Sequence, residues 1–125
     1  MPHMLLIHEP VGQRATRNEA EGRAVYERML RWGEDLRSRG LLLGAESLAS
    51  QDKAVRVSVN VPGGGAGPGK ARIVDGPFAE AKEMVGGFFL VNVDTREEAV
   101  ALAQQCPAAE WATVEVRGLA PCFDR

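Results

Sequence analysis

Residues 88–93 read FFLVNV and are apolar at every position but one. A continuous apolar run of this length is typical of a strand that is covered on both faces. Residues 4–7 read MLLI and form an unbroken apolar run, inside a strand predicted over residues 3–8. These two segments are therefore predicted to be the central strands of one sheet.

The remaining strand segments differ from these two in pattern. Residues 55–61 read VRVSVNV and residues 112–117 read ATVEVR, so apolar and polar side chains alternate in both. Alternation indicates a strand with one solvated face. Short strands are also predicted at 41–43 and 71–74. The glycine-rich stretch 62–69 separates the strand at 55–61 from the strand at 71–74 and is predicted to be a mobile hairpin loop.

The first of two predicted helices has a clear apolar face and two possible starts. Thr16 with Glu19 makes a capping box, and Asn18 with Glu21 makes an equally good one. Apolar residues then recur at helical spacing. These residues are Val25, Met29, Trp32 and Leu36. Gly40 follows as a natural residue for the helix end.

The second helix is capped by Asp94 or Thr95 and stopped by Pro107. The element order is then β-α-β-β-α-β, with an extra hairpin inserted before the third core strand. This order predicts an α+β protein of ferredoxin-like fold, with both helices on one face of an antiparallel sheet.

Length and composition limit the possibilities further. The chain has 125 residues, which predicts one domain over residues 1–125, with a C-terminal tail at about 119–125. The net charge of −2 argues against nucleic-acid binding. No apolar run approaches the ~20 residues of a membrane span. The two cysteines suggest neither a redox pair nor a zinc site, so we expect a reduced, cytoplasmic protein.

The predicted sheet leaves one face without helices. Its central strands carry large apolar side chains on both faces, and an uncovered apolar face of that size is rare on a monomer. We therefore expect the protein to be its own partner, as a homodimer with the two sheets packed face to face, or as a ring built on similar contacts.

The most unusual stretch is DGPFAEAKE at residues 75–83. Asp75 can bond to backbone N–H groups of the turn that follows it. Glu80, Lys82 and Glu83 would lie close together just before a central strand, where two carboxylates and a lysine could tune an acid or base or hold a polar ligand. The alternative is a buried turn braced by Asp75, with the three charges forming a salt-bridged lip.

The two histidines do not indicate a metal site. His3 and His8 are an odd number of positions apart, so on a regular strand they face opposite sides of the sheet. His8 is the better candidate for a group in a pocket, or for a base near neutral pH. A solvated or hydrogen-bonded histidine without a further role is the alternative.

The chain resembles the YCII-related proteins, in particular the subgroup with the Asp-Gly-Pro-Phe motif found here at residues 75–78. Residues 4–7, 36–40, 98–103, 106–109 and 114–117 carry the rest of the likeness. The resemblance implies a ferredoxin-like fold and a dimeric α+β barrel, and it implies little about the reaction. The resemblance also implies that some relatives use a catalytic His–Asp pair. At the matching positions this chain has Met29 and Cys106.

Three functions follow as hypotheses. The first is a module that binds a small organic ligand in a cleft between the sheet and the inserted hairpin. Its candidate lining is His8, Asp75, Glu80, Lys82 and Glu83, with apolar walls from Phe88 and Trp111. The second is a lyase or hydrolase without metal or organic cofactor that uses His8 or Glu83 as a base. The third is a regulatory interaction protein, because the resemblance implies an association with sigma-factor-type transcription regulators.

Overall fold

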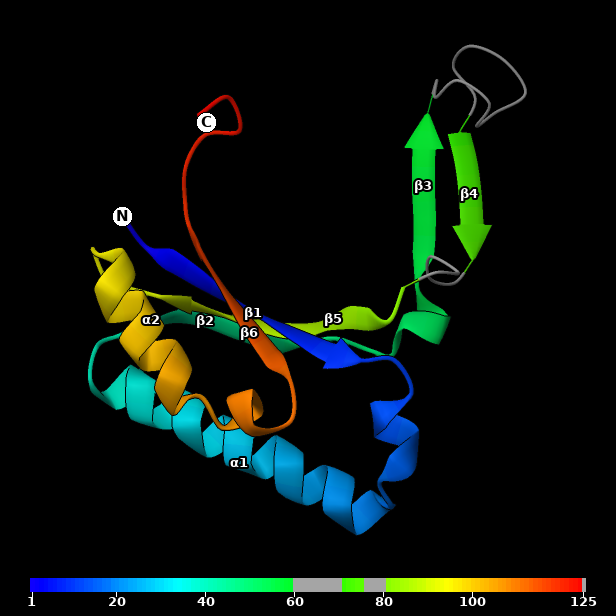
Figure 1. Ribbon diagram of the computed structural model, residues 1–125, viewed down its shortest axis with the longest axis horizontal. Coiled ribbons are helices and arrows are strands. Elements are labelled where there is room, and N and C mark those ends of the chain that lie inside the picture. The colour runs from blue at the N-terminus through cyan, green and yellow to red at the C-terminus, as the bar shows by residue number, and fades with distance from the viewer. Residues whose placement is uncertain (60–70, 76–80, 125) are drawn as a thin grey trace. The chain divides into compact units, whose positions relative to one another are not determined.

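The computed structural model describes residues 1–59, 71–75 and 81–124 (Figure 1). The strands are β1 (His3–Pro10), β2 (Leu42–Ser47), β3 (Val55–Val59), β4 (Ala71–Asp75), β5 (Glu83–Val91) and β6 (Thr113–Gly118). The helices are α1 (Glu19–Ser38) and α2 (Arg96–Gln105), with short 3-10 helices η1 (Gln13–Thr16), η2 (Gln51–Lys53) and η3 (Pro107–Glu110). The chain divides into two compact units. Residues 1–48 and 83–125 form the sheet unit, and residues 49–82 form the hairpin unit.

The sheet unit is built on a four-stranded antiparallel sheet in the order β2-β5-β1-β6. The two strands with continuous apolar runs, β1 and β5, are therefore central, as predicted. Leu5 lies opposite Phe89 on one side and opposite Val116 on the other. This register places the apolar residues of three strands on one face, where they can pack together.

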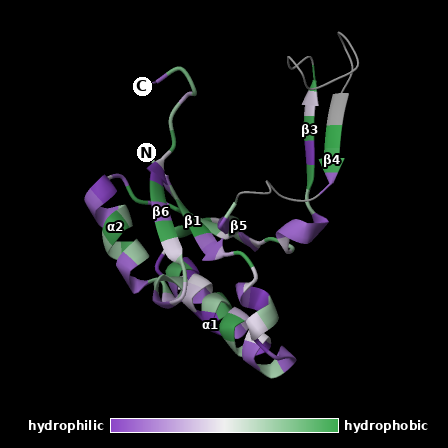
Figure 2. Ribbon diagram, turned by 45° about the vertical axis from the view of Figure 1, so that its right-hand side comes forward, coloured by the Kyte–Doolittle hydropathy of each residue, from purple (hydrophilic) through white to green (hydrophobic). Residues whose placement is uncertain are grey.

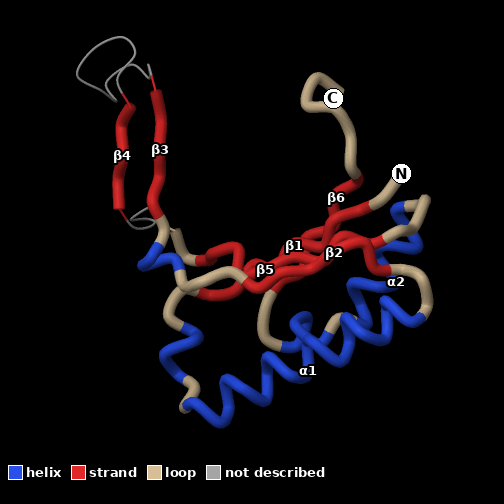
Figure 3. Tube along the Cα trace, turned by 180° about the vertical axis from the view of Figure 1, so that it is seen from behind, coloured by secondary structure: helices blue, strands red, loops and turns tan. Residues whose placement is uncertain are grey.

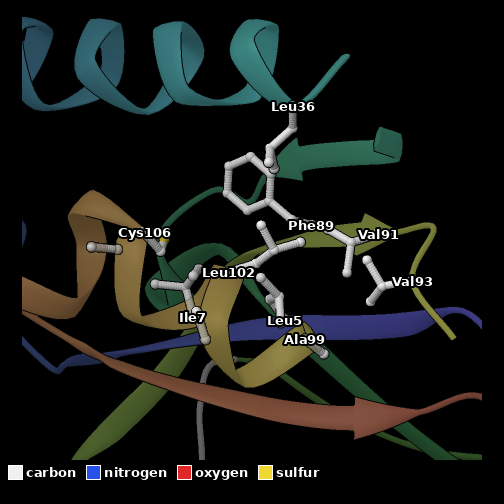
Figure 4. Packing of buried hydrophobic residues seen from close by; sticks show 11 residues of the cluster. Leu5, Ile7, Leu36, Phe89, Val91, Val93, Ala99, Leu102 and Cys106 are labelled. Atoms are coloured by element: carbon white, nitrogen blue, oxygen red, sulfur yellow. The ribbon is translucent and has the colours of Figure 1, made fainter. Parts of the chain in front are cut away.

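Both helices cover the same face of this sheet (Figure 3). Leu5, Leu36 and Val91 are completely buried between the sheet and the helices. Figure 4 shows the ring of Phe89 pointing from β5 toward Leu36 on α1. Burying a side chain of this kind contributes about 1.5–3 kcal/mol, so this interface is a main source of stability. The α+β fold with its β-α-β-β-α-β order and extra hairpin is thus confirmed.

Helix α1 uses the second of its two possible starts. The Asn18 side chain accepts a hydrogen bond from the backbone of Glu21 at 2.8 Å, and the Glu21 carboxylate accepts one from the backbone of Asn18 at 3.0 Å. At the other end Gly40 has a φ of +72°, and the N–H of Leu41 reaches the carbonyl of Leu36. This is the glycine-dependent helix end that the sequence indicates. Hydrophobic and hydrophilic residues alternate along the helix (Figure 2).

Strand β5 begins earlier than the apolar run suggests. We expect a strand over residues 88–93, whereas the observed strand is Glu83–Val91. Its first residues pair with β1 through Glu83 opposite Pro10 and Val85 opposite His8, with a bulge before Gly87 opposite Ile7. The prediction of the start was wrong because a glutamate and two glycines lower the apolar content of the strand's first half.

The hairpin unit holds β3 and β4, which pair antiparallel with Val57 opposite Ile73. Val55, Val57, Val59 and Ile73 are half-exposed or more in this hairpin. The short 3-10 helix η2 precedes β3. The predicted glycine-rich loop, 62–69, lies outside the described residues, as do residues 76–80. The single domain stays a prediction.

Candidate active or ligand-binding cavity

The sheet unit contains a cavity of about 1030 Å³ between α1 and the sheet. Its walls come from β1, η1, α1, β2, β5 and the residues around η3. Tyr26, Leu30 and Leu43 line it and are all more than half exposed, so the cavity opens to solvent between α1 and β2. This space is called the α1 cavity below.

The inner wall of the α1 cavity is apolar. Val25 and Met29 are four residues apart on α1 and therefore lie on the same side of the helix. Ile7 on β1 and Phe89 on β5 contribute from the sheet, and Trp111 also lines the cavity. An apolar wall of this kind can hold the body of an organic molecule.

A buried ion pair borders the same space. Glu9 is the last inward-facing residue of β1 and is only 7% exposed. Arg14 on η1 donates its Nε–H to Oε1 of Glu9 across 2.5 Å. The same guanidinium donates to the carbonyl of Leu48 at 2.8 Å and to the carbonyl of Gly86 at 3.3 Å. Arg14 therefore connects η1 to three different segments of the sheet unit.

Gly86 makes room for this ion pair. It is the bulge residue of β5, and a Cβ atom there would overlap the carboxylate of Glu9 and lie 3.0 Å from a terminal nitrogen of Arg14. To admit it, the two side chains would have to shift together or break their 2.5 Å hydrogen bond. The bulge and the glycine together therefore fit the strand to the buried charges.

Charged groups also surround Trp111. The guanidinium carbons of Arg17 and Arg28 lie 5.8 Å and 5.6 Å from the centre of its ring, within the range of a cation–π contact. Arg28 also forms an ion pair with Glu110. The hydrogen bond from Arg28 lowers the pKa of the Glu110 carboxyl, and the same bond raises the pKa of the guanidinium. Gln13 donates from its side chain to the backbone carbonyl of Trp111 at 2.7 Å.

A family model, the YCII-related domain, matches residues 1–122, which is nearly the whole chain. The chain belongs to the YCII-related family. No curated protein shows a significant match to it. The family resemblance found in the sequence is thus confirmed at this level, while membership of the Asp-Gly-Pro-Phe subgroup stays a prediction.

The structure distributes the predicted site residues of this YCII-related domain over different places. His8 and Glu83 belong to the sheet unit, and neither lines the α1 cavity. His8 shares a hydrogen bond of 2.7 Å with the carboxylate of Glu115, and its strand position puts it on the face away from Ile7 and Glu9. Glu83 is exposed at the start of β5.

The other three predicted residues belong to the hairpin unit. Asp75 ends β4, Lys82 is the last residue of the unit, and Glu80 lies outside the described residues. The predicted grouping of these charges therefore stays a prediction. Of the predicted apolar walls, Trp111 lines the α1 cavity, whereas the Phe88 side chain lies opposite Leu6 on the sheet face without helices.

The two positions for which the resemblance implies a catalytic pair hold residues of another kind. Met29 is half-buried against the core and lines the α1 cavity. Cys106 is 2% exposed, and burial raises the pKa of its thiol to about 11. A thiol in this environment is protonated at neutral pH and unreactive.

Sequence reasoning missed Glu9, Arg14 and Arg17. A signal for Glu9 was present, because His3, Leu5 and Ile7 alternate toward the buried face and Glu9 is the next residue in that series. A carboxylate that falls on a buried face requires a partner. Arg14 and Arg17 follow Pro10 and Gly12, where the strand pattern stops, and nothing in the sequence indicated η1.

Metal and membrane chemistry receive no support from the part of the chain that the structure describes. There, no three histidine, cysteine or acidic side chains come together in a way that could hold a metal ion. Among the same residues, neither helix combines the length and the apolar character needed to cross a bilayer. The cytoplasmic location stays a prediction.

Proposed function

We propose that this YCII-related domain binds a small organic ligand in the α1 cavity. The observation that carries the proposal is the combination of a volume of about 1030 Å³, an apolar inner wall and a buried ion pair in the lining. Binding sites for organic molecules have this size and this mixture of surfaces. The walls belong to helices and strands of one unit, which favours a site with a fixed shape.

The proposal differs from the sequence hypothesis in which residues supply the polar groups. Of the expected apolar walls, Trp111 is retained, and Phe89 lines the cavity in place of Phe88. Glu9 and Arg14 take the place of His8 and Glu83, which do not line this cavity. A cofactor-free enzyme that uses His8 or Glu83 as a base would need a different site, so the cavity gives that alternative no support.

A probe experiment with matched variants tests the proposal. N-phenyl-1-naphthylamine is uncharged, and its fluorescence rises in an apolar site. Val25→Phe enlarges a side chain in the cavity wall, and Val100→Phe makes the same change on α2 at a residue that does not line the cavity. We expect the protein and V100F to bind the probe equally and V25F to bind it at least about tenfold more weakly, because overfilling removes the space that the probe occupies.

Two results would contradict the proposed site. Equal binding by V25F and the unchanged protein would show that the probe binds elsewhere. Absence of binding to the unchanged protein, together with no rise in Tm across a library of small metabolites, would contradict ligand binding altogether, because a ligand of the folded state must stabilise it.

We further propose that two copies pack their sheets face to face as a dimeric α+β barrel. The support comes from the sheet face without helices, where Leu6 lies opposite Phe88 and Met4 lies opposite Leu90 on the two central strands. Val85, on the same face, is 39% exposed. An apolar patch across two central strands favours association.

Light scattering at micromolar concentration tests the dimer. We expect the unchanged protein to have twice the monomer mass and Leu6→Glu to have the monomer mass. Val100→Glu adds the same charge on α2 and should keep the mass of the dimer. A larger closed ring that Leu6→Glu also dissociates would support the contact between sheet faces and contradict the number of subunits. A monodisperse unchanged monomer would refute the association.

We also propose that the chain belongs to the Asp-Gly-Pro-Phe subgroup, on the support of residues 75–78 of the sequence. Association with a sigma-factor-type regulator is the weaker proposal, because only the family resemblance supports it. Co-purification with such a regulator from a shared expression host is the direct test, and failure of the purified pair to associate at micromolar concentration would contradict it.

A further inference from the structure

We propose that the ligand of the α1 cavity is an organic monoanion, a carboxylate or sulfonate joined to an aromatic or other bulky apolar group. Arg17 would bind the acidic group beside Trp111. This inference rests on the proposed function, because it names the chemical class that the same cavity would accept.

Arg17 has the geometry of an anion-binding residue. It lines the α1 cavity, is half-buried, and places its guanidinium over the Trp111 ring at 5.8 Å. Within residues 1–59, 71–75 and 81–124, no carboxylate forms an ion pair with it. A guanidinium on an aromatic face can still donate from its edge, and that edge matches the two oxygens of a carboxylate.

Two other arginines near Arg17 already have partners, whereas Arg31, which also lines the cavity, pairs with none of the described carboxylates. Arg14 is bound to Glu9, and Arg28 is bound to Glu110. Arg17 therefore contributes a positive charge at the Trp111 end that the described neighbours do not neutralise. A ligand anion would supply the missing negative charge, and a hydrogen bond between ionised partners is roughly twice as strong as one between neutral groups.

The apolar part of the ligand follows from the wall beside Arg17. Trp111, Val25 and Ile7 line the same cavity and offer it ring and methyl surface. An inorganic anion would leave this surface exposed to water. An anion that carries an apolar body would bury it, which contributes about 25 cal/mol per Å².

The backbone at both recognition residues is held in place before any ligand arrives. The backbone carbonyl of Trp111 accepts the hydrogen bond from Gln13, and its N–H donates to the carbonyl of Ala108 at 3.1 Å. Arg17 directly precedes Asn18, whose capping box fixes the start of α1. Such preorganisation lowers the entropy cost of binding.

Two probes that differ by one charged group test the inference. 8-Anilinonaphthalene-1-sulfonate and N-phenyl-1-naphthylamine share an aromatic skeleton, and only the first carries a sulfonate. We expect Arg17→Met to weaken sulfonate binding about 10- to 100-fold, as for a lost hydrogen bond between charged groups, and to change binding of the neutral probe less than about twofold. Arg17→Lys keeps the positive charge but lacks the paired N–H donors of the guanidinium. Its affinity for the sulfonate should therefore fall between those of the unchanged protein and Arg17→Met.

Arg23→Met is the matched control, because it removes the same charge from α1 at a residue that pairs with Glu19 and does not line the cavity. It should leave both probes unaffected, and circular dichroism should show that each variant is folded. If R17M weakens both probes equally or neither, Arg17 does not recognise the anion, although the proposed function stands. If R23M lowers sulfonate binding as much as R17M, overall charge is responsible and the inference fails. If neither probe binds the unchanged protein, the proposed function itself fails.

Discussion

Glu9 and Arg14 form the buried ion pair that joins η1 to the end of β1. The pair is joined at 2.5 Å, and the two side chains are 10% and 34% exposed. Glu9 comes from the face of β1 that packs against the helices, so its charge would be costly there without a partner. The remaining donors of Arg14 satisfy two backbone carbonyls, at Leu48 and Gly86.

Arg14→Met should lower the free energy of unfolding by about 2–4 kcal/mol, because it leaves the Glu9 carboxylate buried and unpaired. The double variant E9M/R14M should recover at least about half of this loss, since it removes the second charge as well. Urea unfolding at one fixed protein concentration measures both values. Additive losses in the double variant would show that the pair is not coupled.

Arg23→Met provides the exposed comparison for this experiment. Arg23 and Glu19 pair across one turn of α1 with both side chains more than 70% exposed. Such pairs contribute no more than about 0.5 kcal/mol. A loss from R23M as large as that from R14M would contradict the importance given to burial.

Gly86→Ala should be destabilising by about 1–3 kcal/mol, because the added methyl group overlaps the Glu9 carboxylate. Gly22→Ala is the matched control, since a Cβ atom at this position on α1 meets nothing within 4 Å. That change should stabilise the protein by up to about 1 kcal/mol through the helix preference of alanine. Thermal unfolding measured side by side gives both signs, and a neutral G86A would show that the ion pair has room to shift.

The sequence determined the sheet well because its two strongest signals depend on burial. The apolar runs at residues 4–7 and 88–93 mark strands covered on both faces, and β1 and β5 are the central pair. The early start of β5 was not predicted, because its first residues lack a continuous apolar pattern. Glu83 and Gly86 carry no apolar signal, and the pairing of this half of the strand depends on β1.

The candidate cavity was harder to predict, because its polar residues come from separate segments. Trp111 was expected as an apolar wall, whereas Phe89 and not Phe88 faces the cavity, because consecutive residues of a strand point to opposite faces. Arg14 and Arg17 are placed by η1, a short element that no periodicity announces. The most unusual motif, at residues 75–83, supplied most of the predicted polar residues instead, and most of this motif belongs to the hairpin unit.

Asn18→Ala should cost about 1 kcal/mol of stability, because it removes the side chain that caps α1. Thr16→Ala tests the rival helix start left open by the sequence. The Thr16 hydroxyl donates only to the carbonyl of Gln13, at an exposed position. Its loss should change stability by less than about 0.5 kcal/mol. Equal effects of the two variants in urea unfolding would contradict the observed start of α1.

The Cys106 thiol should lower the stability of the fold at alkaline pH. Burial raises its pKa from 9.0 to about 11, so between these values the folded chain keeps a proton that the unfolded chain releases. The folded state then binds more protons, and the free energy of unfolding falls as pH rises, by about 2–3 kcal/mol in total. Below pH 9 the thiol keeps its proton in both states, so none of this stability is lost.

Cysteine-to-alanine substitution isolates this effect from other groups that titrate in the same range. The stability of the unchanged protein should fall more steeply from pH 9 to 11 than that of Cys106→Ala, with no such difference for Cys122→Ala, because Cys122 is exposed. At pH 8 a thiol reagent should label Cys122 rapidly and Cys106 only on unfolding. Rapid labelling of both thiols, or parallel stability curves for the protein and C106A, would mean that Cys106 is accessible to water and that its pKa is not raised.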